Sequence, residues 1–243
     1  MGVKTDYATS VRNEIDRYAV WEPGQPLALG DFGELHDKTF EKRGSIKDFG
    51  ISFGEVSSSK AFYEFTSAGT SIAEASLNGT INVGLPVASP RASLDLKFAR
   101  ERGLFLRAAD SYTVQIDNLY TLAAALSRLS DWKFHWKVIA EIRIAPSAVI
   151  LMGRTANSTV KVEASVDALE QFRLGKLKAD AGLSMTGEVG YKVIGVQGPL
   201  LVDLIRIRRF WGDAVRQLDG VDAKEPYERV STIDTEDDSG VVK

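Results

Sequence analysis

Few residues of this chain are of a type and spacing that support a known chemistry. The stretch Ser57 to Lys60 matches the S-x-x-K pattern, in which a serine acts as the nucleophile and a lysine lies nearby. The companion elements S-D-N and K-T-G are absent from the sequence. Because so short a pattern arises often by chance, we interpret this stretch as a turn. The sequence also lacks the glycine-rich nucleotide-binding motifs, the H-E-x-x-H zinc motif and the G-x-S-x-G nucleophile motif.

The remaining candidates for acid-base or metal chemistry are two histidines and scattered carboxylates. His135 lies between two lysines and His36 follows two acidic residues in a turn-rich stretch, and two such different contexts do not predict a metal site. The chain has no cysteine, which excludes disulfides, thiolate nucleophiles and cysteine-based metal sites. We therefore predict no enzymatic activity, no cofactor and no metal. An alternative that stays open is an enzyme whose site is assembled from carboxylates such as Asp31, Glu34 and Asp48.

Charge separates the last part of the chain from the rest. Residues 220–243 contain seven acidic and three basic residues and have a net charge of −4. Because the whole chain has a net charge of −3, residues 1–219 have a net charge of +1. A nearly neutral body argues against nucleic-acid binding, which needs a broad basic surface. The acidic tail is predicted to be disordered. A basic cluster could bind anionic lipid or phosphate, or form one solvated face of a strand: Arg206, Arg208 and Arg209.

The clearest structural pattern lies in the middle of the chain, from Lys133 to Ile144. Apolar residues occupy one parity of this stretch: Phe134, Trp136, Val138, Ala140, Ile142 and Ile144. A period of two over this length predicts a long strand with one apolar and one polar face. Ala145 to Ser147 is predicted to break the strand before the apolar run Ala148 to Met152, and Thr159 to Ser165 alternates again. The middle of the chain is thus predicted to be an antiparallel sheet.

Shorter elements surround this sheet. Helical spacing predicts amphipathic helices over Asp6 to Val20 and, with Asp117 as the N-cap, over residues 119–129. Leu94, Leu96 and Phe98 alternate with polar residues in a further strand, and Gly198-Pro199 is expected to turn into a final strand. No membrane-spanning helix or signal peptide is apparent, which predicts a cytosolic protein. Residues 1–219 are therefore predicted to form one α+β domain with a strongly twisted, mainly antiparallel sheet, long hairpins and a few amphipathic helices.

The order of these elements resembles that of the gasdermin pore-forming domain. The matching stretches are Phe62 to Phe98, Leu119 to Leu129 leading into Phe134 to Met152, and Gly195 to Arg208. Bacterial gasdermins are about this size and end in a short inhibitory tail, which Gly220 to Lys243 resembles. Some bacterial members carry a lipidated cysteine near the start, and this chain has none, so the resemblance does not extend to an inhibited state assisted by that lipid.

The resemblance implies a non-enzymatic protein that is held soluble until triggered, then moves to the inner face of a membrane, binds anionic lipid and self-associates into a pore. It implies membrane-spanning strands at the alternating residues named above, from Phe134 to Ile144 and from Leu94 to Phe98, and lipid contacts at the arginine cluster. A spanning strand needs about 9 to 11 tilted residues with alternating faces. A soluble sheet gives the same alternation. The alternative is therefore a soluble, β-rich binding or scaffold protein for a partner or small ligand.

Overall fold

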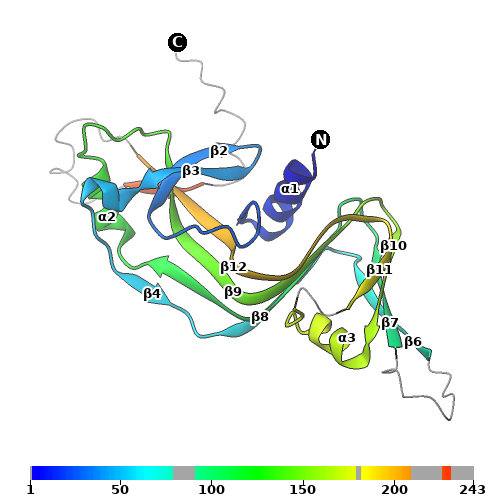
Figure 1. The fold of residues 1–243 in the computed structure, drawn as a ribbon. Coiled ribbons are helices and arrows are strands. Elements are labelled where there is room, and N and C mark those ends of the chain that lie inside the picture. Colours follow the sequence, from blue (N-terminus) through cyan, green and yellow to red (C-terminus); the bar gives the residue numbers. More distant parts are fainter. Residues whose placement is uncertain (1, 79–90, 179–181, 209–225, 231–243) are drawn as a thin grey trace, which may run out of the picture.

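The computed structural model describes residues 2–78, 91–178, 182–208 and 226–230. Over these residues the fold is of the α+β class, as predicted, with helices packed on two antiparallel sheets (Figure 1). The helices are α1 (Val3–Ile15), α2 (Leu119–Leu126) and α3 (Val166–Arg173), together with the 3-10 helix η1 (Ile46–Phe49).

The first sheet is built around three long strands, β8 (Leu104–Ile116), β9 (Lys137–Gly153) and β12 (Val189–Ile207). Strand β9 lies between the other two and pairs with both along most of its length. Shorter strands extend this sheet: β1 (Tyr18–Ala19), β2 (Asp31–His36), β3 (Thr39–Ser45), β4 (Glu55–Ser57), β5 (Ala61–Thr66) and β13 (Tyr227–Arg229). The long strands curve across the molecule, from α2 at one end to the second sheet at the other (Figure 1).

Within the described ranges, the second sheet has four strands. In spatial order they are β11 (Ser184–Gly187), β10 (Ser158–Ser165), β7 (Arg91–Phe98) and β6 (Ser71–Asn78).

Both faces of the long strands are buried where they approach the second sheet. Leu104 and Ile150 belong to a core that also contains Tyr7 and Val11 of α1. The neighbouring residues of opposite parity, such as Leu151, belong to a different core, formed with α3 and the second sheet. Two-sided burial explains why Ala148 to Met152 is a continuous apolar run, as in other strands that are covered on both faces.

The predicted break at Ala145 to Ser147 is wrong, because β9 continues through this stretch. The pairing of β8 with β9 skips Asp110 and Ser111, and Asp110, which would face Pro146, has a φ of 49°. On the other side, the register between β9 and β12 shifts between Val196 and Gly198. These irregularities on both neighbours allow a proline, which cannot donate a ladder hydrogen bond, to lie inside a central strand.

The start of the predicted strand also differs. Strand β9 begins at Lys137, so Phe134 and Trp136 precede it. Lys137 is only 3% exposed and its Nζ donates to the carbonyl oxygen of His135 at 2.9 Å, although its parity predicts a solvated side chain. Ile139 is fully buried as well. The alternation of buried and exposed residues fails here because the first residues of β9 are buried on both faces of the sheet.

Three further boundaries are corrected by the structure. The N-cap of α2 is Asn118, whose side chain accepts from the backbone N–H of Thr121 at 2.9 Å, and not Asp117. Gly198-Pro199 is not a turn but lies within β12. The predicted disorder of the tail does not hold for Tyr227–Arg229, which form β13 on the edge of β12.

Candidate functional site in the second sheet

The second sheet consists of two excursions from the first sheet. One leaves at the end of β5 and returns at the start of β8, and it contains β6 and β7, while β5 and β8 pair with each other. The other leaves at the end of β9 and returns at the start of β12, and it contains β10, α3 and β11, while β9 and β12 pair with each other. Strands β7 and β10 join the two excursions. Each excursion thus interrupts a hairpin of the first sheet.

The face of the second sheet that packs against α3 is apolar. Leu96 of β7 lies opposite Val160 of β10, and Leu94 lies opposite Val162. These four side chains are buried in one core with Phe172 of α3. Strand β7 therefore has the alternation that the sequence predicts for Leu94, Leu96 and Phe98, and α3 covers its apolar side.

Contacts with β8 hold α3 in place. The rings of Phe105 and Phe172 stack, with centroids 5.7 Å apart and planes 11° apart. Nη1 of Arg107 donates to the carbonyl oxygen of Arg173, the last residue of α3, at 2.6 Å. Gly175 follows with a φ of 66°, and a Cβ there would lie 2.7 Å from the backbone of Arg107, so glycine permits the close approach. The helix is thus docked by stacking, by a hydrogen bond and by backbone proximity.

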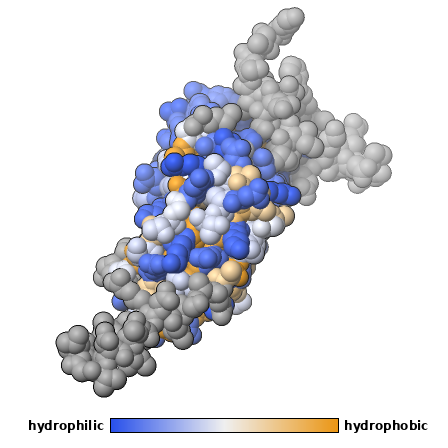
Figure 2. Space-filling model, turned by 90° about the vertical axis from the view of Figure 1, so that its right-hand side faces the viewer, coloured by the Kyte–Doolittle hydropathy of each residue, from blue (hydrophilic) through white to orange (hydrophobic). Residues whose placement is uncertain are grey.

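The other face of the second sheet is polar. Lys97 and Thr159 lie opposite each other and are exposed, and Lys161 pairs with Glu163 on the same strand. Figure 2, a view of the side on which the second sheet lies in Figure 1, shows mainly hydrophilic side chains around small apolar areas. The sheet therefore presents polar groups to solvent while its apolar groups stay under α3.

The two predicted sets of membrane-spanning residues do not come together in this structure. Val138, Ala140 and Ile142 are buried in the core of the first sheet, and Phe134, Trp136 and Ile144 pack against that core with partial exposure. Trp136 contacts the ring of Phe32, with a centroid distance of 4.5 Å. Leu94, Leu96 and Phe98 lie in the second sheet instead.

The predicted arginine cluster is occupied by an acidic partner from the tail. Glu228 of β13 accepts hydrogen bonds from Arg206, and from Nε and Nη2 of Arg208 at 3.0 and 2.8 Å. Burial alone would raise the pKa of Glu228, but the hydrogen bonds and charges of Arg208 and Arg206 outweigh it and hold the pKa below its usual value. Arg209 lies outside the described residues.

The residue after β13 anchors the tail to the first sheet and to α1. The backbone N–H of Val230 donates to the carbonyl oxygen of Leu204 at 2.9 Å. The side chain of Val230 is buried in the core of the first sheet that also contains Val138 and Ile142. Nη2 of Arg12, in α1, donates to the carbonyl oxygen of Val230 at 2.9 Å. Arg12 is 2% exposed and lies over the ring of Tyr18. The sequence does not reveal this anchor, because its partners are far apart in the chain.

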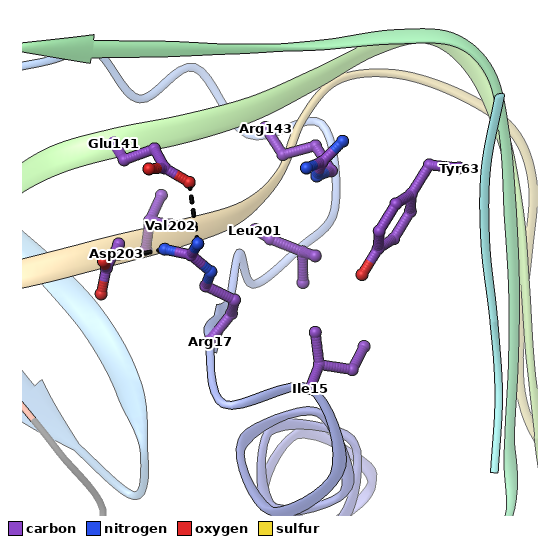
Figure 3. A pocket seen from close by; sticks show the side chains of 8 residues that line it. All are labelled: Ile15, Arg17, Tyr63, Glu141, Arg143, Leu201, Val202 and Asp203. Atoms are coloured by element: carbon purple, nitrogen blue, oxygen red, sulfur yellow. Dashed lines mark ion pairs between the residues drawn. The ribbon is translucent and has the colours of Figure 1, made fainter. Parts of the chain in front are cut away.

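A pocket lies between the segment that follows α1 and the first sheet (Figure 3). Nη2 of Arg17 contacts Glu141 at 3.1 Å and Nη1 contacts Asp203 at 2.8 Å, so both carboxylates share one guanidinium. Arg143 lies over the ring of Tyr63, 4.3 Å from its centroid. None of these residues stands out in the sequence, where each belongs to an ordinary polar or alternating stretch.

Both histidines contact Glu34, although only His36 is close to Glu34 in the sequence. Nε2 of His36 and Nε2 of His135 each lie 3.4 Å from a carboxylate oxygen of Glu34. Desolvation would raise the pKa of Glu34, but hydrogen bonds from Arg43 and from the two histidines hold it below its usual value. The histidine side chains are about half exposed, at 52% and 53%. In the part of the chain that the structure describes, no cluster of three or more such side chains could hold a metal ion.

The three carboxylates of the alternative enzymatic site have separate partners. Asp31 is buried, accepts from the backbone N–H of Ala28 and pairs with Lys42 at 2.9 Å. Asp48 accepts from the backbone N–H of Ser45 and completes the capping box of η1. These contacts give Asp31 and Asp48 structural roles, and they do not place them with Glu34 in one site.

No protein family model and no curated protein sequence matches this chain. Among the described residues, no helix is long and apolar enough to cross a membrane.

Proposed function

We propose that this protein is a non-enzymatic, membrane-active protein of the gasdermin-like, pore-forming type. In this proposal the second sheet is released from α3 and its two excursions straighten. Each excursion then continues the hairpin that it interrupts, giving two long, strongly twisted hairpins per chain that enter an anionic membrane. Several copies associate to close the strand edges, because a spanning sheet must satisfy all of its backbone hydrogen bonds.

The observation that carries the proposal is the way in which both excursions leave and rejoin paired strands. Strands β5 and β8 pair next to the first excursion, and β9 and β12 pair next to the second. Straightening would therefore preserve the pairing that already exists in the first sheet. It would break mainly the contacts between β7 and β10 and those under α3.

The side-chain pattern of the second sheet also supports it. Strands β7 and β10 each have eight residues, close to the 9 to 11 or so that a tilted spanning strand needs. Apolar and polar residues alternate throughout β7, and in β10 they alternate from Thr159 onward. Their apolar parity would face lipid and their polar parity would face the pore lumen. In the soluble protein, α3 takes the place of lipid by covering the apolar parity.

Strand β13 acts as an inhibitor of membrane binding and self-association in this proposal. Strand β13 covers the edge of β12, and Glu228 forms ion pairs with both Arg206 and Arg208. Removal of β13 would leave an unpaired strand edge beside two free cations. Each cation near an anionic membrane contributes about 1 kcal/mol of attraction, and an unpaired edge favours association with another chain.

Glu228→Gln tests this role. The substitution removes one charge from a partly exposed ion-pair cluster, which we expect to weaken β13 by about 1 kcal/mol and to speed dye release from anionic liposomes about fivefold. Glu55→Gln is the control, because it removes the same charge from an exposed side chain of β4, which pairs with β8 and lies outside both excursions. Equal rates for the two variants at several anionic lipid contents would contradict the inhibitory role. Failure of a chain that lacks β13 altogether to release dye at any lipid content would contradict the proposed function.

The lowered pKa of Glu228 sets the pH dependence of the same contact. A carboxylate whose pKa is depressed in the folded state stabilises that state above its unfolded pKa, which is about 4.3 for glutamate. This contribution is lost as the pH falls through the folded-state value. We therefore expect no release of β13 by mild acidification from neutral pH.

A further inference from the structure

We infer that the pocket lined by Arg17, Arg143 and Tyr63 binds a small monocarboxylate with a short apolar chain. The pocket has a volume of about 200 Å³. This is smaller than the roughly 300 to 1,000 Å³ of sites for drug-sized ligands, so a small molecule fits it better. The inference is independent of the proposed pore-forming function.

Arg143 provides the anion-binding group. Its guanidinium lies over the ring of Tyr63, and its other contact is with the hydroxyl of Ser111 at 3.5 Å. Among the described residues, no aspartate or glutamate lies within ion-pair distance of it. A half-buried guanidinium without a carboxylate partner is suited to bidentate recognition of a carboxylate ligand. Figure 3 shows the Arg143 and Tyr63 side chains on the same side of the pocket.

The charges around the pocket favour a ligand with a single negative charge. Arg17 is shared by Glu141 and Asp203, and Arg229 of β13 also contacts Asp203. The two acids are therefore matched by Arg17 and Arg229, and Arg143 is the cation in excess. A doubly charged anion such as phosphate would meet the two nearby carboxylates, which repel it.

The remaining wall of the pocket supplies an apolar surface and a hydroxyl donor. Ile15 and Leu201 line the pocket, and Leu201 lies between Arg17 and Arg143 in Figure 3. Desolvation raises the pKa of Tyr63, against the smaller effects of Arg143 and Arg17, so its hydroxyl remains protonated and able to donate at neutral pH. A carboxylate at Arg143 would thus have a hydrogen-bond donor beside it and aliphatic side chains for its chain.

Titration of the full chain with butyrate, hexanoate, benzoate, dodecanoate and inorganic phosphate, followed by NMR chemical shifts and calorimetry, tests the inference. We expect saturable binding of the short carboxylates, with shifts at Tyr63 and Leu201, and weaker binding of dodecanoate and phosphate. Arg143→Gln should weaken binding about 10- to 100-fold, as loss of a hydrogen-bonded charge does. The control Arg154→Gln, at an exposed arginine that does not line the pocket, should bind as the wild type does.

Tyr63→Phe keeps the ring under Arg143 and removes only the hydroxyl, so it serves if Arg143→Gln does not fold. We expect it to weaken binding several-fold. Wild-type affinity in both folded variants, or in Tyr63→Phe alone if only that variant folds, would overturn the inference. So would the absence of saturable binding by any short carboxylate, or equal binding of phosphate and butyrate.

Discussion

A chain that ends at Asp219 is expected to permeabilise anionic liposomes at least about tenfold faster than the full chain. This truncation removes β13 and with it the ion pairs of Glu228, the backbone pairing with Ile205 to Ile207 and the burial of Val230. It also removes the carbonyl oxygen that accepts from Nη2 of the buried Arg12, whose Nη1 retains Asp16 as its partner. Together these contacts exceed the roughly 1.4 kcal/mol that a tenfold change in population requires. Dye release and the oligomeric state on liposomes are the measurements, and added salt should weaken the binding.

A chain that ends at Ser231 is the matched control. It loses four of the seven acidic residues of the tail but keeps Glu228 and Val230. We expect it to behave like the full chain, because the inhibitory contact is a strand and its ion pairs rather than the charge of the tail. Equal activation of both truncated chains would show that charge alone inhibits. Inactivity of both, with intact folding, would contradict the pore-forming proposal.

Phe172→Ala is expected to have two large effects. Phe172 is fully buried and stacks on Phe105, and truncation of such a side chain costs about 3 to 5 kcal/mol of unfolding free energy. The loss falls on the contact between α3 and β8, which the proposal requires to open before the second sheet can straighten. The variant should therefore release dye faster than the wild type, and its unfolding free energy should be lower than that of the wild type. Denaturant unfolding and liposome assays measure the two effects.

Ile139→Ala separates local release from general destabilisation. Ile139 is also fully buried, but it belongs to the core of the first sheet, which the proposal leaves intact. Its truncation should cost about 2 to 5 kcal/mol without a comparable gain in dye release. If both variants speed release equally at matched stability, then opening of α3 is not the step that limits insertion.

Local patterns were sufficient to predict many elements of the fold. Strand β7, strand β10 and helix α2 follow from alternation and helical spacing, because one face of each is mostly buried and the other is mostly solvated. The pattern failed where both faces are covered. Lys137 is buried against expectation, and Pro146 lies inside β9 because the neighbouring strands are irregular beside it. Neither neighbour is visible from the sequence of β9 itself.

The candidate sites were less predictable, because they depend on contacts between distant residues. Arg206 and Arg208 were recognisable as a basic cluster, but their pairing with Glu228 depends on β13, which lies in a stretch with the composition of a disordered tail. The pocket lined by Arg17, Arg143 and Tyr63 is formed by residues at the end of α1 and by residues of β5, β9 and β12. Local sequence can predict a turn or a helix cap, but contacts between residues far apart in the chain depend on the tertiary fold.

Single-cysteine scanning of β7 tests the central claim most directly, namely that the second sheet enters the membrane. The chain has no native cysteine, so a fluorescent label at any one introduced position is unique. Labels would be placed in turn at each position from Ser93 to Lys97, and quenching by a lipid-borne quencher would be measured with the chain ending at Asp219 on anionic liposomes. We expect quenching to alternate, high at Leu94 and Leu96 and low at Ser93, Asp95 and Lys97. Absence of quenching at all five positions while dye is released, or uniform quenching along the strand, would contradict the account.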